Sequence, residues 1–303
     1  MSSKSRSRSA VLTDEQWARL EPLLPSNAGR RGHPFRENRR VVEGIIFRSR
    51  TGIAWRDLPR EQFGPWQTVW KRHRRYAGDG TWDRALAQLI AEADAAGDVD
   101  WNVSVDATIV RAHQHATNTS RPEQDTGAGS NHKNLPLDEV EPPGHGIGRS
   151  RGGLTTKIHH AVDGRGRPLA IVVTGGQRND GAMLQRVLVD IRVPRIGGGR
   201  SRTRPDAVIA DKAYSAGVIR RALHSRGIKV VIPEKSDQIA ARKKRGRRGG
   251  RPPSLDSVSY KGRNVVERSF AKNKRWRAIA TRYDKLAITY RAAAVLHGIL
   301  EWI

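Results

Sequence analysis

The sequence predicts a small all-α domain followed by an α/β domain with a mixed sheet and flanking helices. Apolar residues recur at helical spacing between residues 11 and 100. From Trp101 the pattern changes to the alternation of a strand, and strands then alternate with helices as far as 228–232. A length of 303 residues is also typical of two domains. We therefore expect a disordered basic tail at 1–10, a helical domain at 11–100 and an α/β domain at 101–303.

The helical domain begins where Thr13 can cap a first helix and Gln16 can return the capping bond. Apolar positions at helical spacing and residues typical of helix ends define the helices that follow. These helices are predicted over residues 41–52, from Pro65 onward, and from Thr81 to Gly97.

The α/β domain begins with a strand in which Val103, Val105 and Ala107 alternate with polar residues around Asp106. Residues 114–153 lack a period and are rich in Gly, Pro, Asn and Ser, so we expect a long surface insertion there. The remaining elements are predicted as a hairpin of strands 155–162 and 169–174, helices 180–191 and 216–225, strands 207–210 and 228–232, a basic loop at 235–257, and two closing helices.

The charge of the chain is its most unusual property. It has 56 Lys and Arg against 30 Asp and Glu, a net charge of +26. This excess predicts a polyanionic partner, and because no apolar run approaches the roughly 20 residues of a bilayer span, nucleic acid is the leading candidate. The chain has no cysteine, which excludes disulfides and cysteine catalysis and fits a reducing cytoplasm.

Two cationic clusters are candidate DNA contacts. The segment 242–251 is expected to follow phosphates without reading bases, unless it is only a solvated loop. A second cluster on the helix that begins at Pro65 would suit the recognition helix of a helix-turn-helix-like domain. The first cluster consists of Arg242, Lys243, Lys244, Arg245, Arg247, Arg248 and Arg251, and the second of Lys71, Arg72, Arg74 and Arg75.

Two aspartates in strands need an explanation because acids are scarce in this chain. Asp106 lies in the middle of a strand, and Asp211 follows the apolar run AVIA. A carboxylate in a sheet costs several kcal/mol unless it is hydrogen-bonded, paired or bound to a metal. Taken separately, Asp106 can be explained by a buried salt bridge and Asp211 by a helix cap.

A third carboxylate, Glu267, lies in the segment 260–274, which we place on one helix. Helical geometry would then put Tyr260, Arg263 and Lys274 on the same stripe as Glu267. An ordinary ion pair between Arg263 and Glu267 would explain two of these residues but not the other two. A glutamate among cations would be held in its charged form, ready for a divalent ion.

The spacing Tyr, two residues, Arg, three residues, Glu, six residues, Lys is similar to the signature around the catalytic glutamate of bacterial insertion-sequence transposases of the DDE class. Other segments resemble the same group, so the resemblance covers almost the whole chain. These segments are VSVDATIVRAHQHATN, GRSRGGLTTKIHHAVDG, RNVVERSFAKNKRWRAIATRYDK, LTDEQWARLEPLLP and GIAWRDLPREQFGPWQTVWKRHRR.

The resemblance implies a ribonuclease H-like catalytic domain in which Asp106, Asp211 and Glu267 are catalytic. It also implies that Tyr260, Arg263 and Lys274 hold the DNA end. Three carboxylates can hold two Mg²⁺ ions, with Mn²⁺ as a possible substitute, for phosphoryl transfer. In this family water cuts at each element end and the freed 3′ hydroxyl attacks target DNA. The implied partner is double-stranded DNA in the bacterial nucleoid, bound by a homodimer or a larger assembly.

Other interpretations of the sequence stay open. His113 and His115, two residues apart on the predicted strand, could bind a transition metal or make DNA or structural contacts. A metal-dependent DNA nuclease without strand transfer would need the same carboxylates. A basic DNA-binding protein without enzymatic activity would need none of them.

Overall fold

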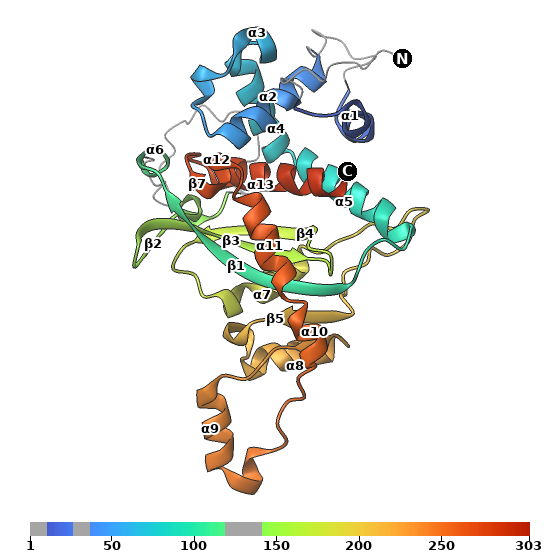
Figure 1. Cartoon of the computed structure of the whole chain (residues 1–303), viewed down its shortest axis with the longest axis vertical. Coiled ribbons are helices and arrows are strands. Elements are labelled where there is room, and N and C mark those ends of the chain that lie inside the picture. Colours follow the sequence, from blue (N-terminus) through green and yellow to red (C-terminus); the bar gives the residue numbers. More distant parts are fainter. Residues whose placement is uncertain (1–10, 27–36, 119–140) are drawn as a thin grey trace, which may run out of the picture. The chain divides into compact units, whose positions relative to one another are not determined.

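The computed structural model describes residues 11–26, 37–118 and 141–303, and the chain forms two compact units (Figure 1). The expected tail at 1–10 lies outside the described residues. Each unit is assembled from segments that are far apart in the sequence, so this division differs from the single boundary expected near residue 100. Among the described residues, the first unit contains 11–26, 37–89, 110–118, 141–147 and 273–303, and the second contains 90–109 and 148–272.

The first unit is mainly helical. The predicted cap at Thr13 is confirmed, because Gln16 N–H donates to Thr13 Oγ1 at 3.1 Å and Thr13 N–H donates to Gln16 Oε1 at 3.1 Å. The helices predicted at 41–52, Pro65 and Thr81 are also present. In chain order the helices are α1 (Asp14–Leu20), α2 (Asn38–Thr51), α3 (Arg60–Phe63), α4 (Trp66–Gly78), α5 (Thr81–Ala95, which continues into the second unit), α6 (Gln114–Thr117), α12 (Arg277–Ala280) and α13 (Ala287–Trp302).

Helix α13 is buried along most of its length and packs against α4. The His73 ring of α4 is hydrogen-bonded through Nε2 to the carbonyl oxygen of Thr289, at 3.1 Å. Glu141 accepts the N–H groups of Ala287 and Ile288 at 2.6 and 3.0 Å and so caps the start of α13. The end of the expected insertion at 114–153 is therefore structured, and residues 119–140 lie outside the described part of the chain.

The second unit is built on a mixed sheet, as predicted. The strand order is β2-β3-β1-β5-β6, with β4 paired to β3. The last residues of β1, from Val110 on, belong to the first unit and pair there with β7. Strands β1, β5 and β6 run parallel, whereas β2, β3 and β4 are antiparallel neighbours. The strands are β1 (Asn102–Ala112), β2 (Gly148–Ser150), β3 (Gly153–Val162), β4 (Pro168–Gly175), β5 (Ala207–Ala210), β6 (Lys229–Val231) and β7 (Thr281–Arg282).

Helices cover both faces of strand β3. Val162 forms an apolar cluster with residues of α11, and the His160 ring lies 4.7 Å from that of Phe270, also on α11. Lys157 instead pairs with Asp180 of α7 at 2.8 Å. Because successive side chains in a strand point to opposite faces, α11 and α7 lie on opposite sides of β3. The helices of this unit are α7 (Asp180–Val189), α8 (Gly217–Ser225), α9 (Ser236–Lys244), α10 (Ser257–Lys261) and α11 (Asn264–Asn273).

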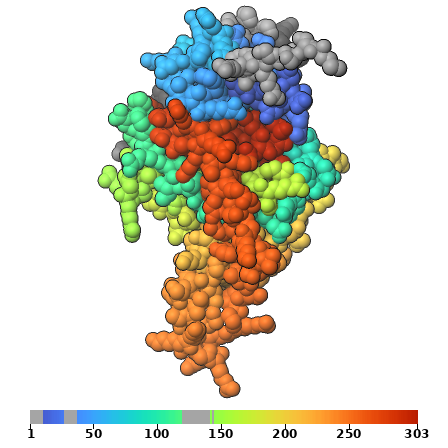
Figure 2. Space-filling model, viewed as in Figure 1, coloured from blue at the N-terminus to red at the C-terminus, as the bar shows by residue number. Residues whose placement is uncertain are grey.

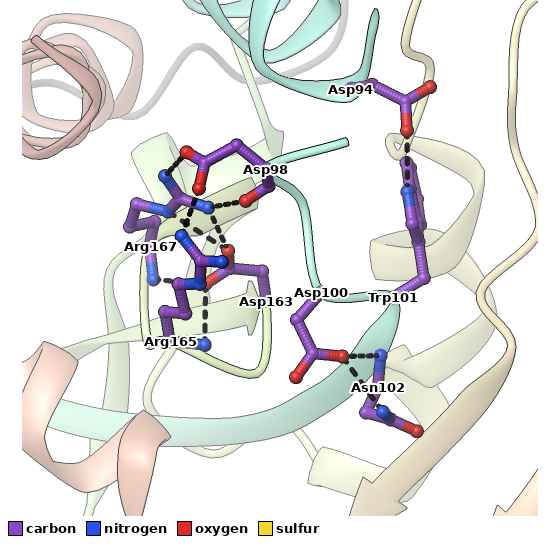
Figure 3. A network of polar contacts seen from close by, with 8 residues as sticks. All are labelled: Asp94, Asp98, Asp100, Trp101, Asn102, Asp163, Arg165 and Arg167. Carbon is purple, nitrogen blue, oxygen red and sulfur yellow. Dashed lines mark hydrogen bonds and ion pairs between the residues drawn. The ribbon is translucent and has the colours of Figure 1, made fainter. Parts of the chain in front are cut away.

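The turn of the predicted hairpin between β3 and β4 is fastened to the segment that leads into β1 (Figure 3). Asp163 is fully buried, and its carboxylate accepts the N–H groups of Arg165 and Arg167 at 3.0 and 2.8 Å. The two arginines also form ion pairs with Asp98. These contacts fix the start of β1 within its own unit.

None of the helices in the described ranges is long and apolar enough to cross a membrane.

Candidate active site

Parallel pairing of β1 and β5 brings Asp106 and Asp211 to the same place in the sheet. The register pairs Val105 with Ala210; Asp106 is the next residue of β1, and Asp211 is the first residue after β5. Functional side chains of α/β sheets commonly follow the carboxyl ends of parallel strands. Asp211 Oδ1 accepts the N–H of Ala213 at 2.8 Å and caps a short 3₁₀ helix. This is the helix cap that the sequence allowed for Asp211.

Asp106 is partly buried and lies close to other charges. Burial raises the pKa of Asp106 above its ordinary value, and the negative charge of Asp211 raises it further. The N–H of Ala107 and the Arg263 guanidinium act in the opposite direction. Asp106 and Asp211 therefore interact electrostatically, as two carboxylates of one site would.

Glu267 reaches the site from α11. The buried side of this helix holds Val265, Val266 and Phe270, which pack with Val162 of β3. Glu267 lies beside this buried side and faces solvent, with 45% of its side chain exposed. The sheet and this helix together place a third carboxylate where solvent and a ligand can reach it.

Arg263 joins Glu267 to Asp106. Its Nη1 donates to Asp106 Oδ2 at 3.1 Å and its Nη2 donates to Glu267 Oε1. The pKa of Arg263 is raised because these carboxylates outweigh the effect of its partial burial. The sequence anticipated the pair with Glu267, but the bond to Asp106 depends on the three-dimensional fold.

The expectation that residues 260–274 form one helix is wrong. Tyr260 belongs to α10, Gly262 and Arg263 form a turn, and Lys274 follows the end of α11. The break occurs where Gly262, a poor helix former, caps α10. Tyr260 packs against an apolar cluster of β5 and β6, and Lys274 belongs to the first unit.

The donor set fits a hard divalent cation, but the side chains are not arranged around one. Within the part of the chain that the structure describes, no group of three His, Asp or Glu side chains could hold a metal ion as it stands. The positive charge between Asp106 and Glu267 comes from the Arg263 guanidinium instead. Carboxylate oxygens are the ligands that Mg²⁺ prefers, so the residues fit magnesium once Arg263 moves aside.

Replacing Arg263 by glutamine should therefore strengthen divalent-ion binding. A partly exposed ion pair is worth up to about 1 kcal/mol. Wild-type protein must break both ion pairs of Arg263 before it binds the ion, so it should bind Mn²⁺ about tenfold more weakly than Arg263→Gln. Isothermal titration calorimetry measures the two dissociation constants. Arg268→Gln is the matched control, because Arg268 is an exposed cation of α11 that bonds Asn264 at 2.7 Å. Equal affinity in Arg263→Gln and wild type would contradict the competition.

Tyr214, which lies three residues after Asp211, is a further residue near the carboxylates that no sequence pattern indicated. Its side chain is 1% exposed, and its hydroxyl has no hydrogen-bond partner among the described residues. Burial raises the pKa of Tyr214 strongly, and Asp106, Asp180 and Asp211 raise it further. The hydroxyl thus stays protonated near the carboxylates and is available as a donor. The only signal in the sequence is its place just after an acidic strand end.

The cations predicted on α4 do not share one exposed surface. Arg72 is 7% exposed and donates to Asn38 Oδ1 at 2.6 Å, so it is part of the core of the first unit. Arg74 is partly buried and lies over the Trp70 ring. Lys71 and Arg75, one turn apart, are exposed. The structure therefore leaves these two residues as candidate DNA contacts and gives Arg72 a structural role.

The segment 235–257, which the sequence predicts as a basic loop, contains the helix α9, so the prediction of a loop is wrong for residues 236–244. Figure 2 shows this segment in orange, extending away from the rest of its own unit. Arg242 forms an ion pair with Glu234 at 2.6 Å, which holds the base of the segment. We call residues 236–251 the basic lobe. The other cations predicted here are exposed: Lys243, Lys244, Arg245, Arg247, Arg248 and Arg251.

His113 and His115 do not lie on a strand, because β1 ends at Ala112. His113 caps α6, and its Nδ1 accepts the N–H of His115 at 3.2 Å. The two rings stand edge to face, 4.5 Å apart. This arrangement indicates a local structural role.

Comparison with known proteins assigns both parts of the chain to transposases. The family model "Putative transposase of IS4/5 family" matches residues 12–86, and "Transposase DDE domain" matches residues 99–300. The putative transposase for insertion sequence element IS6501 of Brucella ovis is 30% identical over 150 residues, which are 50% of this chain and 99% of that protein. An uncharacterized protein of Sinorhizobium fredii, y4sN, is 40% identical over 111 residues, 36% of this chain and 83% of the relative.

Among solved structures, a Mos1 transposase paired-end complex with the left transposon end covers 80% of this chain and 79% of its own. The sequence identity is 13% and the TM-score is 0.25, so the two chains agree little in three dimensions. The family models, in contrast, cover both the helical segment and the segment that carries the three carboxylates. The chain therefore belongs to the insertion-sequence transposases with a DDE domain.

Proposed function

We propose that this transposase binds the ends of its insertion sequence, cleaves the DNA there by metal-dependent hydrolysis, and joins the freed 3′ ends to target DNA. The observation that carries the proposal is the meeting of Asp106 and Asp211 on adjacent parallel strands, with Glu267 linked to Asp106 through Arg263. Phosphoryl transfer with two divalent ions needs three such carboxylates, which would converge on the ions once Arg263 moves aside.

In this mechanism Asp106, Asp211 and Glu267 would hold the ions. When bound, Mg²⁺ or Mn²⁺ supplies Lewis-acid stabilisation of the charge that develops on the scissile phosphate. The pKa of Asp106 is raised because burial disfavours its charged form, and Arg263 offsets this effect only in part. A bound cation would stabilise the charged form further. Arg263 would turn from the carboxylates to a phosphate of the DNA end, and the Tyr214 hydroxyl would donate a hydrogen bond to one of the aspartates.

Duplex DNA would be bound by several parts of the chain. We assign recognition of the element ends to a helix-turn-helix-like domain at 11–100, with Lys71 and Arg75 on α4. We assign catalysis to a ribonuclease H-like domain at 101–303. The basic lobe would follow the phosphate backbone, and Tyr260, Arg263 and Lys274 would hold the cut end, as in the signature. A homodimer or a larger assembly would bring two ends together in the bacterial nucleoid.

A strand-transfer assay tests the proposal. The full chain, incubated with Mg²⁺, a duplex carrying a precut element end and a plasmid, should join the 3′ end to the plasmid. The same duplex with a 3′-dideoxy end is the control and should give no joined product, because it lacks the attacking hydroxyl. Cutting without joining would identify a nuclease, and binding with neither reaction would identify a DNA-binding protein without enzymatic activity.

A further inference from the structure

The second unit has an arginine-lined hollow that the proposed chemistry does not use. It lies where β5 and β6 begin, has a volume of about 490 Å³, and adjoins a smaller one of about 400 Å³. Five arginines and one aspartate, together with small polar residues, line the larger one, which leaves four positive charges in excess. We call it the arginine hollow. Its charged residues are Arg195, Arg200, Arg202, Arg204, Arg226 and Asp206.

Most of this charge is not neutralised within the protein. Asp206 is paired with Arg202, at 3.0 Å. The guanidinium groups of Arg195, Arg200 and Arg204 make no hydrogen bond or ion pair within the described ranges, 11–26, 37–118 and 141–303. Like charges gathered in a hollow repel one another and concentrate a positive potential there. An anionic ligand would remove this repulsion.

The wall of the hollow is held in place from inside the unit. The Arg202 guanidinium lies 4.0 Å from the centre of the Trp101 ring and 3.6 Å from Asp94. The indole N–H of Trp101 donates to Asp94 at 2.8 Å, as Figure 3 shows. Arg226 donates to the carbonyl oxygen of Thr203 at 3.0 Å. These bonds fix two arginines of the hollow while three others face solvent.

A glycine-rich loop forms part of the same region. Gly197, Gly198 and Gly199 all have positive φ angles, and a Cβ atom at any of them would meet no other atom within 4 Å. The backbone beside Arg195 and Arg200 is therefore bare and open to solvent. Phosphate groups are commonly bound where glycine lets a ligand approach the backbone N–H groups.

The hollow is distant from the carboxylates within the unit. Asp206 precedes β5 and Asp211 follows it. Five residues of extended chain span roughly 16 Å. A phosphate in the hollow is therefore not the phosphate that is cut.

We infer that the arginine hollow is a second DNA-binding surface, which holds the phosphate backbone of duplex DNA away from the point of cleavage. The inference rests on the proposed function, in which duplex DNA is the substrate. Free arginines, an excess of positive charge and a bare glycine loop are the features that bind a phosphate backbone without reading bases. This surface would carry a part of the duplex that the carboxylates do not reach.

Removing three charges from the hollow tests the inference. In the full chain without divalent ions, the triple variant Arg195→Gln, Arg200→Gln, Arg204→Gln should bind a random-sequence duplex less tightly. The slope of log K against log salt should fall by up to about 3, since each phosphate contact contributes about 0.9. Fluorescence anisotropy over a range of salt measures it. The matched control removes three other exposed charges of the second unit, in Arg149→Gln, Arg151→Gln, Arg221→Gln.

The outcomes separate this inference from the proposed function. If the wild type fails to bind duplex DNA, the proposed function itself is wrong. If the wild type binds but the hollow and control variants show the same slope, the inference is overturned. Hydrogen exchange of the wild type is the second measurement and requires no substitution. Amides of residues 195–204 should be protected by the duplex, whereas equal protection by inorganic phosphate, or no protection by DNA, would also overturn it.

Discussion

Replacing Glu267 by glutamine should reduce magnesium-dependent DNA cleavage by a factor of at least about a thousand while folding and DNA binding persist. The substitution keeps the size of the side chain and its place on the exposed side of α11. In the proposed mechanism it removes a charge that holds a divalent ion, and the loss of one ligand would cost on the order of 4 kcal/mol of transition-state stabilisation. Single-turnover cleavage of a labelled duplex measures the loss.

Asp106→Asn and Asp211→Asn should have effects of similar size. The effects should not add, because in the proposed mechanism the three carboxylates hold the same two metal ions and act as a unit. Asp190→Asn is the control. Asp190 ends α7 in the same unit and pairs with Arg186 at 3.5 Å. Its replacement should leave cleavage near the wild-type rate. If Glu267→Gln cleaved as fast as wild type, Glu267 would be only an ion-pair partner of Arg263.

Replacing Asp284 by asparagine should destabilise the first unit by about 3–5 kcal/mol, because the partner Arg48 would keep a buried and unpaired charge. Arg48 Nη1 lies 2.9 Å from Asp284 Oδ2, and their side chains are 4% and 8% exposed. Arg48 also lies over the Trp55 ring. Denaturant unfolding, followed by tryptophan fluorescence, measures the change in the free energy of unfolding.

Asp83→Asn provides the matched control. It breaks the more exposed pair between Asp83 and Arg291 in the same unit and should cost no more than about 1 kcal/mol. Burial alone would raise the pKa of Asp284, but Arg48 and His73 together hold it below its ordinary value. The pair therefore stabilises the fold above pH about 4, and the stabilisation is lost as the pH falls further. Similar losses in both variants would show that burial does not matter here.

The sequence predicts the secondary structure well where the pattern is local. The cap at Thr13, the strand around Asp106 and the strand end at Asp211 follow from spacing and residue type. Their meeting, in contrast, depends on the register of β1 with β5, which pairs Val105 with Ala210 and cannot be read from the sequence. The prediction of a single helix at 260–274 was wrong because it rested on helical spacing alone and did not take into account that Gly262 is a poor helix former.

Contacts between distant segments could not be predicted from the sequence. Charge alone groups Arg72 with Lys71 and Arg75, but Arg72 lies on the buried side of α4 and donates to Asn38, a contact that the sequence does not show. The bond between Arg263 and Asp106 joins residues 157 positions apart. Tyr214 likewise becomes a candidate hydrogen-bond donor only when the structure shows its hydroxyl buried near the aspartates. The placement of each of these side chains depends on tertiary packing.

The interleaving of the two units has a consequence for how the chain is made. Residues 1–89 leave the ribosome before residues 273–303, but α13 belongs to the later segment and packs against α4. Domains usually fold as units in the order of their synthesis. Here the helical unit cannot be completed until residues 273–303 have been translated. A nascent or truncated chain that lacks α13 would therefore expose the apolar side of α4 to proteases and chaperones.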